Sequence, residues 1–147
     1  SSAASDVYKR QERLQIRVRE LEEINKAHKK ETIMADFDLK VTENDGVILV
    51  TTNGYLNNYG GEQVASLCLQ KISEGKRKFL LNLANTDMVN SIGVSILIEV
   101  IEELQGTTGI IAFCNLVPIV EKTFNIMGIS KYAKIYANEE EAMAGLA

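Results

Sequence analysis

The segment Met88-Val89-Asn90-Ser91-Ile92-Gly93 carries the residue types best suited to regulatory chemistry. It stands between an apolar, strand-like run and a helix-like run, so we expect Ser91 near the start of a helix. There its hydroxyl can cap the helix by accepting a hydrogen bond from a backbone N–H. The free amides and the helix dipole also favour negative charge, so a phosphoryl group on Ser91 would be well tolerated. The spacing alone leaves both roles open.

Motifs for catalysis are missing from the sequence. It contains neither a Gly-x-x-x-x-Gly-Lys-Ser/Thr loop nor a Gly-x-Gly-x-x-Gly segment. The single histidine, His28, lies in a polar N-terminal stretch and no Cys-x-x-Cys pair occurs, so we expect no metal site and no cofactor. The predicted strand ends carry amides, which hydrogen-bond without titrating. We therefore expect a recognition surface rather than an enzyme. The amides concerned are Asn53, Asn57, Asn82, Asn85, Asn90 and Asn115.

Length and composition exclude further classes of protein. The 147 residues suit about one domain, with 46% hydrophobic and 24% charged residues. A net charge of −4 argues against a nucleic-acid partner. No run of 18 apolar residues is present, and the N-terminus lacks a secretory pattern, so we expect no membrane insertion and a cytoplasmic location. Cys68 and Cys114 lie within apolar runs and are interpreted as small core residues.

From residue 37 onward, strand-like and helix-like patterns alternate. Asn44-Asp45-Gly46 predicts a tight hairpin turn between the first two strands. Further strands are predicted at 78–83, 109–114 and 134–136, and helices are predicted around 64–72, 97–104, 116–127 and after Asn138. The order is hairpin, helix, strand, helix, strand, helix, strand, helix. It indicates an α/β fold whose sheet is parallel after an antiparallel opening hairpin, with helices packed against it.

The N-terminal region differs in composition. Residues 6–34 contain no Gly or Pro and are rich in good helix formers. We predict a helical segment over 1–35 and a separate domain over 36–147. A weak heptad repeat predicts a dimerising coiled coil, with Asn25 as a polar register-setting residue. The alternative is a solvated helix that rests on the following domain. The residues of the proposed dimer seam are Val7, Leu14, Val18, Leu21 and Asn25.

From about Phe37 to Leu146 the chain resembles the STAS domain family, the bacterial anti-sigma factor antagonists and their relatives. Residues 53–57 resemble the family's Gly-x-Leu-Asp turn. FLLNLANTDMVNSIG, residues 79–93, resembles its strand, Asp-Leu-Ser loop and Asp-Ser-Ser-Gly motif. Residues 97–104 fit the helix that follows, and residues 124–129, 135–136 and 139–142 resemble the closing helix, strand and acidic turn.

The resemblance implies a non-enzymatic switch. Family members bind a Ser/Thr kinase that is also an anti-sigma factor, and phosphorylation by that kinase releases it until a phosphatase restores binding. Ser91 matches the phosphoacceptor. The chain has Asn57, Asn82 and Asn90 where relatives commonly have Asp, and Ile92 where they have a small residue. The implied partner-binding residues are Asn57, Asn90, Ser91, Ile92 and Gly93.

Two other interpretations stay open. A helix that leads into a STAS domain resembles the arrangement in stressosome-type sensors. In this alternative, the chain is a coiled-coil-dimerised output or scaffold domain that is not phosphorylated. The Asn- and Gly-rich loops could instead bind a small ligand or nucleotide.

Overall fold

The computed structural model describes residues 2–31 and 37–147, with side chains for 5–23 and 37–147. Its helices are α1 (Ser2–Glu31), α2 (Asn58–Ser73), α3 (Ser91–Gln105), α4 (Pro118–Met127) and α5 (Glu139–Leu146), with a short 3₁₀ helix η1 (Ile129–Lys131). Its strands are β1 (Phe37–Asn44), β2 (Val47–Gly54), β3 (Lys78–Asn85), β4 (Ile110–Cys114) and β5 (Lys134–Tyr136).

The five strands form one sheet in the order β1-β2-β3-β4-β5. β1 and β2 are antiparallel, and every later pair is parallel, which confirms the fold predicted from the sequence. Asp45 and Gly46 form the hairpin turn with φ of 52° and 80°. Two successive positive φ values are what a type I′ turn requires, and Asn, Asp and Gly adopt them at least cost.

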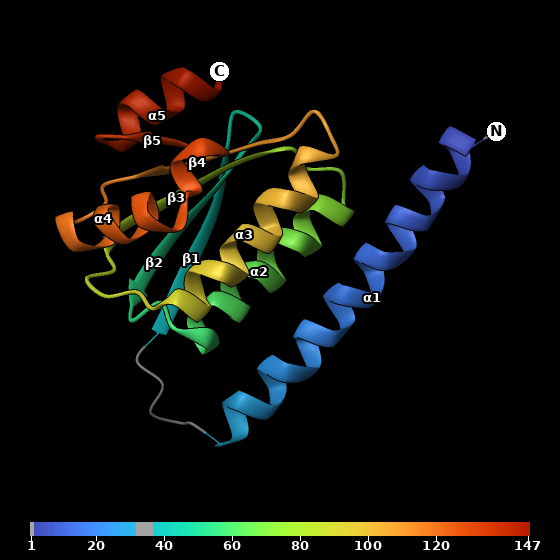
Figure 1. The fold of residues 1–147 in the computed structure, drawn as a ribbon, viewed down its shortest axis with the longest axis horizontal. Coiled ribbons are helices and arrows are strands. Elements are labelled where there is room, and N and C mark those ends of the chain that lie inside the picture. The colour runs from blue at the N-terminus through green and yellow to red at the C-terminus, as the bar shows by residue number, and fades with distance from the viewer. Residues whose placement is uncertain (1, 32–36) are drawn as a thin grey trace.

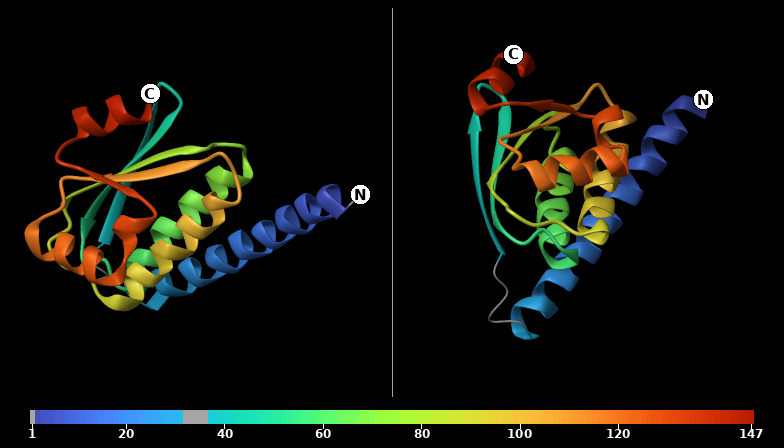
Figure 2. Two further views of the ribbon diagram at one scale, coloured as in Figure 1. Left: turned by 45° about the horizontal axis from the view of Figure 1, so that its top comes forward. Right: turned by 60° about the vertical axis from the view of Figure 1, so that its left-hand side comes forward.

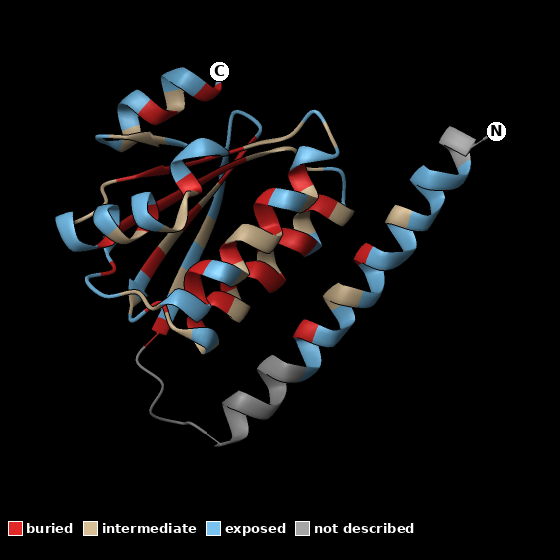
Figure 3. Cartoon of the chain, viewed as in Figure 1, coloured by how far each residue is buried: buried red, intermediate tan, exposed pale blue. Residues whose placement is uncertain are grey.

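Helices cover the two faces of the sheet unequally (Figure 1). α2, α3 and α4 lie on one face, over a large apolar core that includes Phe79, Phe113 and Phe124. The rings of Phe113 and Phe124 meet edge to face with centroids 5.1 Å apart, which fixes α4 against β4. α5 alone covers part of the other face, where a smaller cluster contains Leu80 and Leu146. Figure 3 shows the buried positions gathered between the sheet and its helices.

Helix α1 forms an additional layer outside α2 and α3 (Figure 2). Leu14 and Leu21 are 5% and 0% exposed and belong to the main core, and Val18 packs beside them half-buried. Val7, at the N-terminal end of the same stripe, is 69% exposed. In this structure α1 rests on the following domain, as the alternative interpretation of the N-terminal region describes. The side chain of Asn25 and residues 32–35 lie outside the described residues, so a dimer seam and a two-domain division stay predictions.

The helix ends follow the local sequence. Pro118 begins α4, where its missing N–H costs nothing, and Gly128 ends it with φ of 81°. Asn138 caps α5 by accepting a hydrogen bond from the amide of Glu141 at 2.9 Å. Within the part of the chain that the structure describes, no helix has the length and apolar character to cross a membrane.

Candidate functional site

The loops that follow β2 and β3 are joined at the same edge of the sheet. Leu56 and Val89 form an isolated parallel bridge. The amide of Leu56 donates to the carbonyl oxygen of Met88 at 2.9 Å, and the amide of Asn90 donates to the carbonyl oxygen of Leu56 at 3.2 Å. Because β2 and β3 are parallel, both strands end at this edge of the sheet. The bridge therefore holds the N-termini of α2 and α3 side by side.

Each of these helices begins with an asparagine cap. The Oδ1 atom of Asn57 accepts from the amide of Gly60 at 3.0 Å, and Oδ1 of Asn90 accepts from the amide of Gly93 at 2.8 Å. Of the two roles considered for Ser91, capping of α3 is therefore wrong. Asn is as good an N-cap as Ser, and here it stands one position earlier in extended backbone, so Ser91 becomes the first helical residue.

Glycine allows the close approach of the two helix starts. A Cβ on Gly93 would collide with the carbonyl oxygen of Leu56 and lie 2.8 Å from that of Asn57. A Cβ on Gly61 would lie 3.0 Å from the carbonyl oxygen of Gly93. Gly93 is buried. Its role at the site is therefore to bring the α2 and α3 termini together, rather than to present a side chain.

Ser91 itself is exposed at the first turn of α3. Its carbonyl oxygen accepts from the hydroxyl of Ser95 at 2.8 Å. Among residues 5–23 and 37–147, no hydrogen bond engages the Ser91 hydroxyl. Because Asn90 caps the helix, the Ser91 hydroxyl is accessible to another protein.

Large apolar side chains accompany Ser91 in the same segments. Ile92 is 57% exposed, Met88 is 54% exposed and Tyr55 is 37% exposed. Ile92 was among the expected binding residues, whereas Met88 and Tyr55 were not. Each has one apolar neighbour, Leu56 beside Tyr55 and Val89 beside Met88, and that neighbour is the more buried of the two, so the residue types alone do not show which one faces outward. Exposed apolar residues near one another favour contact with another protein.

The electrostatics of this edge favour a single added anion. The first amides of a helix have no acceptor within the helix, and Asn90 satisfies only that of Gly93. The amides of Ser91 and Ile92 therefore point their partial positive charge outward. Asp87 is the one charged residue in the sequence from 86 to 93. A phosphoryl group on Ser91 would lie at the positive end of α3. The two caps, Asn57 and Asn90, carry neutral amides and would not repel it.

The remaining amides at the strand ends serve the fold. The side chain of Asn82 donates to Oε2 of Glu139 at 2.8 Å, and that of Asn115 donates to Oδ1 of Asn82 at 3.3 Å. These bonds tie the ends of β3 and β4 to the start of α5. Among the six amides only Asn53 and Asn85 are classed as exposed, so the recognition surface is smaller than the sequence suggests.

Both cysteines are free and buried, as the sequence predicts. Burial raises the pKa of Cys68 to about 12. Burial, followed by the negative charge of Glu139, raises the pKa of Cys114 to about 11. Neither thiol ionises near neutral pH, and they contribute packing rather than nucleophilic chemistry.

The molecule is an α/β domain in which the starts of α2 and α3 meet beside Ser91. Residues 38–142 match the STAS domain model, and the chain belongs to the STAS domain family. Helix α1 precedes the matched region. A Bordetella bronchiseptica protein named as the anti-sigma factor antagonist BtrV is 28% identical over 100 residues, which cover 68% of this chain and 85% of that protein. The chain is an anti-sigma factor antagonist-like STAS domain.

Solved structures share this architecture. An anti-sigma factor antagonist from Thermotoga maritima superposes with a TM-score of 0.69 at 18% identity, covering 74% of this chain and 93% of that one. The Bacillus protein SpoIIAA, in its phosphorylated form, gives a TM-score of 0.60 at 22% identity, covering 76% and 99%. At these identities the likeness establishes the fold.

Proposed function

We propose that this protein is a partner-switching regulator whose affinity for an anti-sigma factor is controlled by phosphorylation of Ser91. The observation that carries the proposal is the exposed, uncommitted hydroxyl of Ser91 at the first turn of α3, with Asn90 acting as the cap. The names of the relatives support the class of partner. SpoIIAA, which shares the fold, exists in unphosphorylated and phosphorylated forms.

The unmodified surface suits a protein partner. Tyr55, Met88 and Ile92 supply exposed apolar area around a small polar residue. Burying such side chains contributes about 25 cal/mol per Å² of apolar surface removed from water. The partner-binding set is then Asn57, Asn90, Ser91, Ile92 and Gly93, in which the two asparagines and the glycine fix the backbone and Ser91 and Ile92 make contact.

Phosphorylation acts on the complex and leaves the fold intact. It adds about −1.5 to −2 units of charge at the N-terminus of α3, where the dipole and free amides accommodate an anion. The same charge would have to be desolvated under a docked partner, and an unpaired buried charge costs several kcal/mol. The modified protein therefore stays folded and loses its partner.

The enzymes of the cycle lie outside this chain. The anti-sigma factor acts as the Ser/Thr kinase that modifies Ser91, and a phosphatase removes the phosphoryl group and restores binding. The protein itself performs no catalysis under this proposal, and it works in the cytoplasm, where sigma factors meet RNA polymerase.

Binding measurements with three variants test the proposal. Each anti-sigma factor kinase of the source organism is purified and titrated calorimetrically with wild-type protein, Ser91→Ala, Ser91→Asp and Ser73→Asp. Ser73 is the matched control, because it lies at the opposite end of α2, about 22 Å along the helix from its start. We expect Ser91→Ala and Ser73→Asp to bind like the wild type, and Ser91→Asp to bind at least 100-fold more weakly. Equal affinities for Ser91→Ala and Ser91→Asp would overturn the proposal.

Site-specific phosphorylation provides the second arm. The kinase that binds is incubated with ATP and the protein, and the modified residue is located by mass spectrometry. Ser95, one turn further along α3 and also exposed, is the internal control. We expect phosphate on Ser91 only, and its absence from the Ser91→Ala variant. Modification of Ser95 in place of Ser91 would contradict the assignment.

A further inference from the structure

The face by which α1 docks on its own domain is the face that the heptad repeat marks for pairing. Leu14, Val18 and Leu21 occupy successive seam positions of the repeat, and all three pack toward the core in the structure. A side chain can be buried against only one neighbour at a time. Docking on the domain and pairing with another helix therefore use the same apolar atoms.

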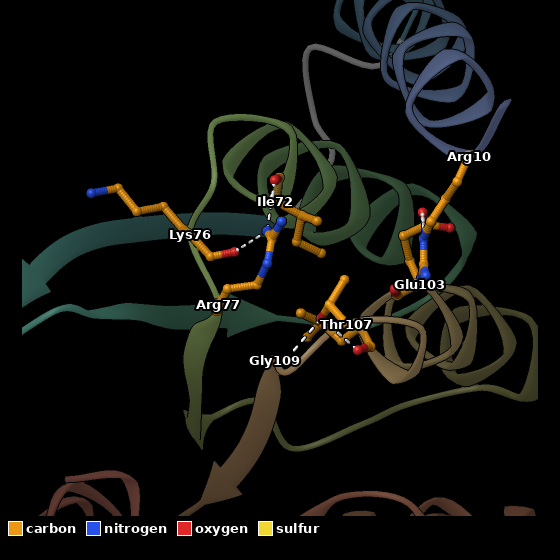
Figure 4. Close-up of polar contacts among 8 residues, drawn as sticks. Arg10, Ile72, Lys76, Arg77, Glu103, Thr107 and Gly109 are labelled. Carbon is orange, nitrogen blue, oxygen red and sulfur yellow. Dashed lines mark hydrogen bonds and ion pairs between the residues drawn. The ribbon is translucent and has the colours of Figure 1, made fainter. Parts of the chain in front are cut away.

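Two ion pairs join α1 to α3. Nε of Arg17 lies 2.6 Å from Oε2 of Glu99, and Nη2 lies 2.8 Å from Oε1, a two-pronged contact. The hydrogen bond that Arg17 donates to Glu99 raises the pKa of Arg17. Nε of Arg10 lies 3.3 Å from Oε1 of Glu103, and the guanidinium also donates to the carbonyl oxygen of Glu103 (Figure 4). All four side chains are partly exposed, so each pair contributes little.

An open cleft of about 310 Å³ lies beside the docked helix, and its lining includes Arg13, Leu14, Leu69 and Glu103. Docking buries the side chains of Leu14 and Leu21, and the two ion pairs beside them stay partly open to solvent. A second helix that supplied apolar side chains and carboxylates at matching positions would replace both kinds of contact.

We propose that α1 pairs with α1 of a second copy of this chain, and that this pairing and the docking of α1 on α2 and α3 exclude each other. In a parallel pair, Arg17 occupies a position flanking the seam, opposite Glu22 of the other copy. Glu22 is exposed in the docked state. Arg17 therefore exchanges Glu99 for a carboxylate on its partner, while Leu14 and Leu21 exchange one apolar neighbour for another. The proposal does not depend on Ser91.

Substitutions on α3 separate the two states, because they weaken docking and leave the α1 sequence unchanged. The full chain with Glu99→Arg and Glu103→Arg is compared with the wild type by sedimentation equilibrium over a range of concentrations. Glu102→Arg is the control, since Glu102 is exposed on the same turns. We expect the dimer dissociation constant of the double variant to fall about tenfold, which corresponds to the loss of two partly exposed ion pairs in each of the two chains. The control should match the wild type.

Two further variants keep the result interpretable. A Cβ on Gly106 would collide with the flexible end of Arg10, so Gly106→Ala displaces that guanidinium from Glu103 without a change of charge and should tighten the dimer by less than the double variant does. Replacing Leu14 and Leu21 by Asn in the Glu99→Arg, Glu103→Arg background should abolish the dimer. A monomeric double variant, a dissociation constant equal to that of the wild type, or a dimer that survives the loss of both leucines would each overturn the proposal.

Discussion

The amide of Asn90 donates to the carbonyl oxygen of Leu56, and this bond joins the loop before α3 to the loop before α2. It is one of the two backbone hydrogen bonds of the Leu56–Val89 bridge, which brings Ser91 to the same edge as Asn57. The position of Ser91 is therefore set by backbone geometry, and side-chain changes at the surface can be tested without moving it.

Gly93→Ala should disrupt this junction. Its Cβ would meet the carbonyl oxygens of Leu56 and Asn57, which are backbone atoms that cannot rotate away. We expect a loss of about 1–3 kcal/mol in the free energy of unfolding, measured by urea denaturation. Ser95→Ala, an exposed change in the same helix, should stay within about 0.5 kcal/mol of the wild type. Equal stability of Gly93→Ala and wild type would show that the helix starts are not in contact.

The cap of α3 gives a second test. Asn90→Ala removes the acceptor of the Gly93 amide and should cost about 1 kcal/mol of stability. Asn90→Asp keeps an oxygen at the same position and should preserve stability to within a few tenths of a kcal/mol. Thermal and urea unfolding of both variants check this ranking. If Ser91→Ala were the more costly change, Ser91 and not Asn90 would be the cap.

Docking of α1 can be measured by amide hydrogen exchange. Leu21 is fully buried, and removing such a side chain typically costs about 2–5 kcal/mol. Leu21→Ala should therefore raise the exchange rates of α1 amides between residues 14 and 21 by about 30-fold or more, through undocking of the helix. Ile16→Ala is the control, because Ile16 is 48% exposed and does not belong to the buried core. Equal exchange in the two variants would contradict the docked arrangement.

The buried thiols predict a loss of stability in alkali. Cys68 and Cys114 have pKa values of about 12 and 11 in the folded chain, against 9.0 for a free thiol. Above pH 9 the unfolded chain releases protons that the folded chain retains, so stability is complete below about pH 8 and falls as pH rises. The slope is at most about 1.4 kcal/mol per pH unit for each thiol.

Urea midpoints between pH 7 and pH 10.5 measure this effect. The comparison is with a Cys68→Ala, Cys114→Ala variant, which keeps every other ionisable group of the chain. We expect a shallower decline in that variant, although its stability at pH 7 is lower because of the lost packing. Identical slopes would mean that the thiols ionise equally in both states.

Most of the fold could be predicted from the sequence, because local and global signals agree. The hairpin turn forms at Asp45-Gly46, and α4 begins at Pro118 and ends at Gly128, as these residue types favour. The alternation of strands and helices then allows few topologies. The order of the elements and the parallel sheet followed from these signals.

The site was only partly predictable. Asn90 and Ser91 are both good caps, and a one-residue difference in the start of α3 decides between them. Met88 and Tyr55 resemble core residues in sequence, and only the path of the loops exposes them. The sequence also did not decide what α1 packs against, because an apolar stripe that contains Leu14 and Leu21 fits either a domain surface or a second helix.

The most direct test of the proposed switch uses the modified protein itself. The chain is prepared with phosphoserine at position 91, and the anti-sigma factor that binds the unmodified protein is titrated against both forms in the same buffer. The phosphoserine form should stay folded, with an unchanged circular dichroism spectrum, and should bind at least 100-fold more weakly. If both forms bind with the same affinity, charge at Ser91 does not control docking, and the proposed function is wrong.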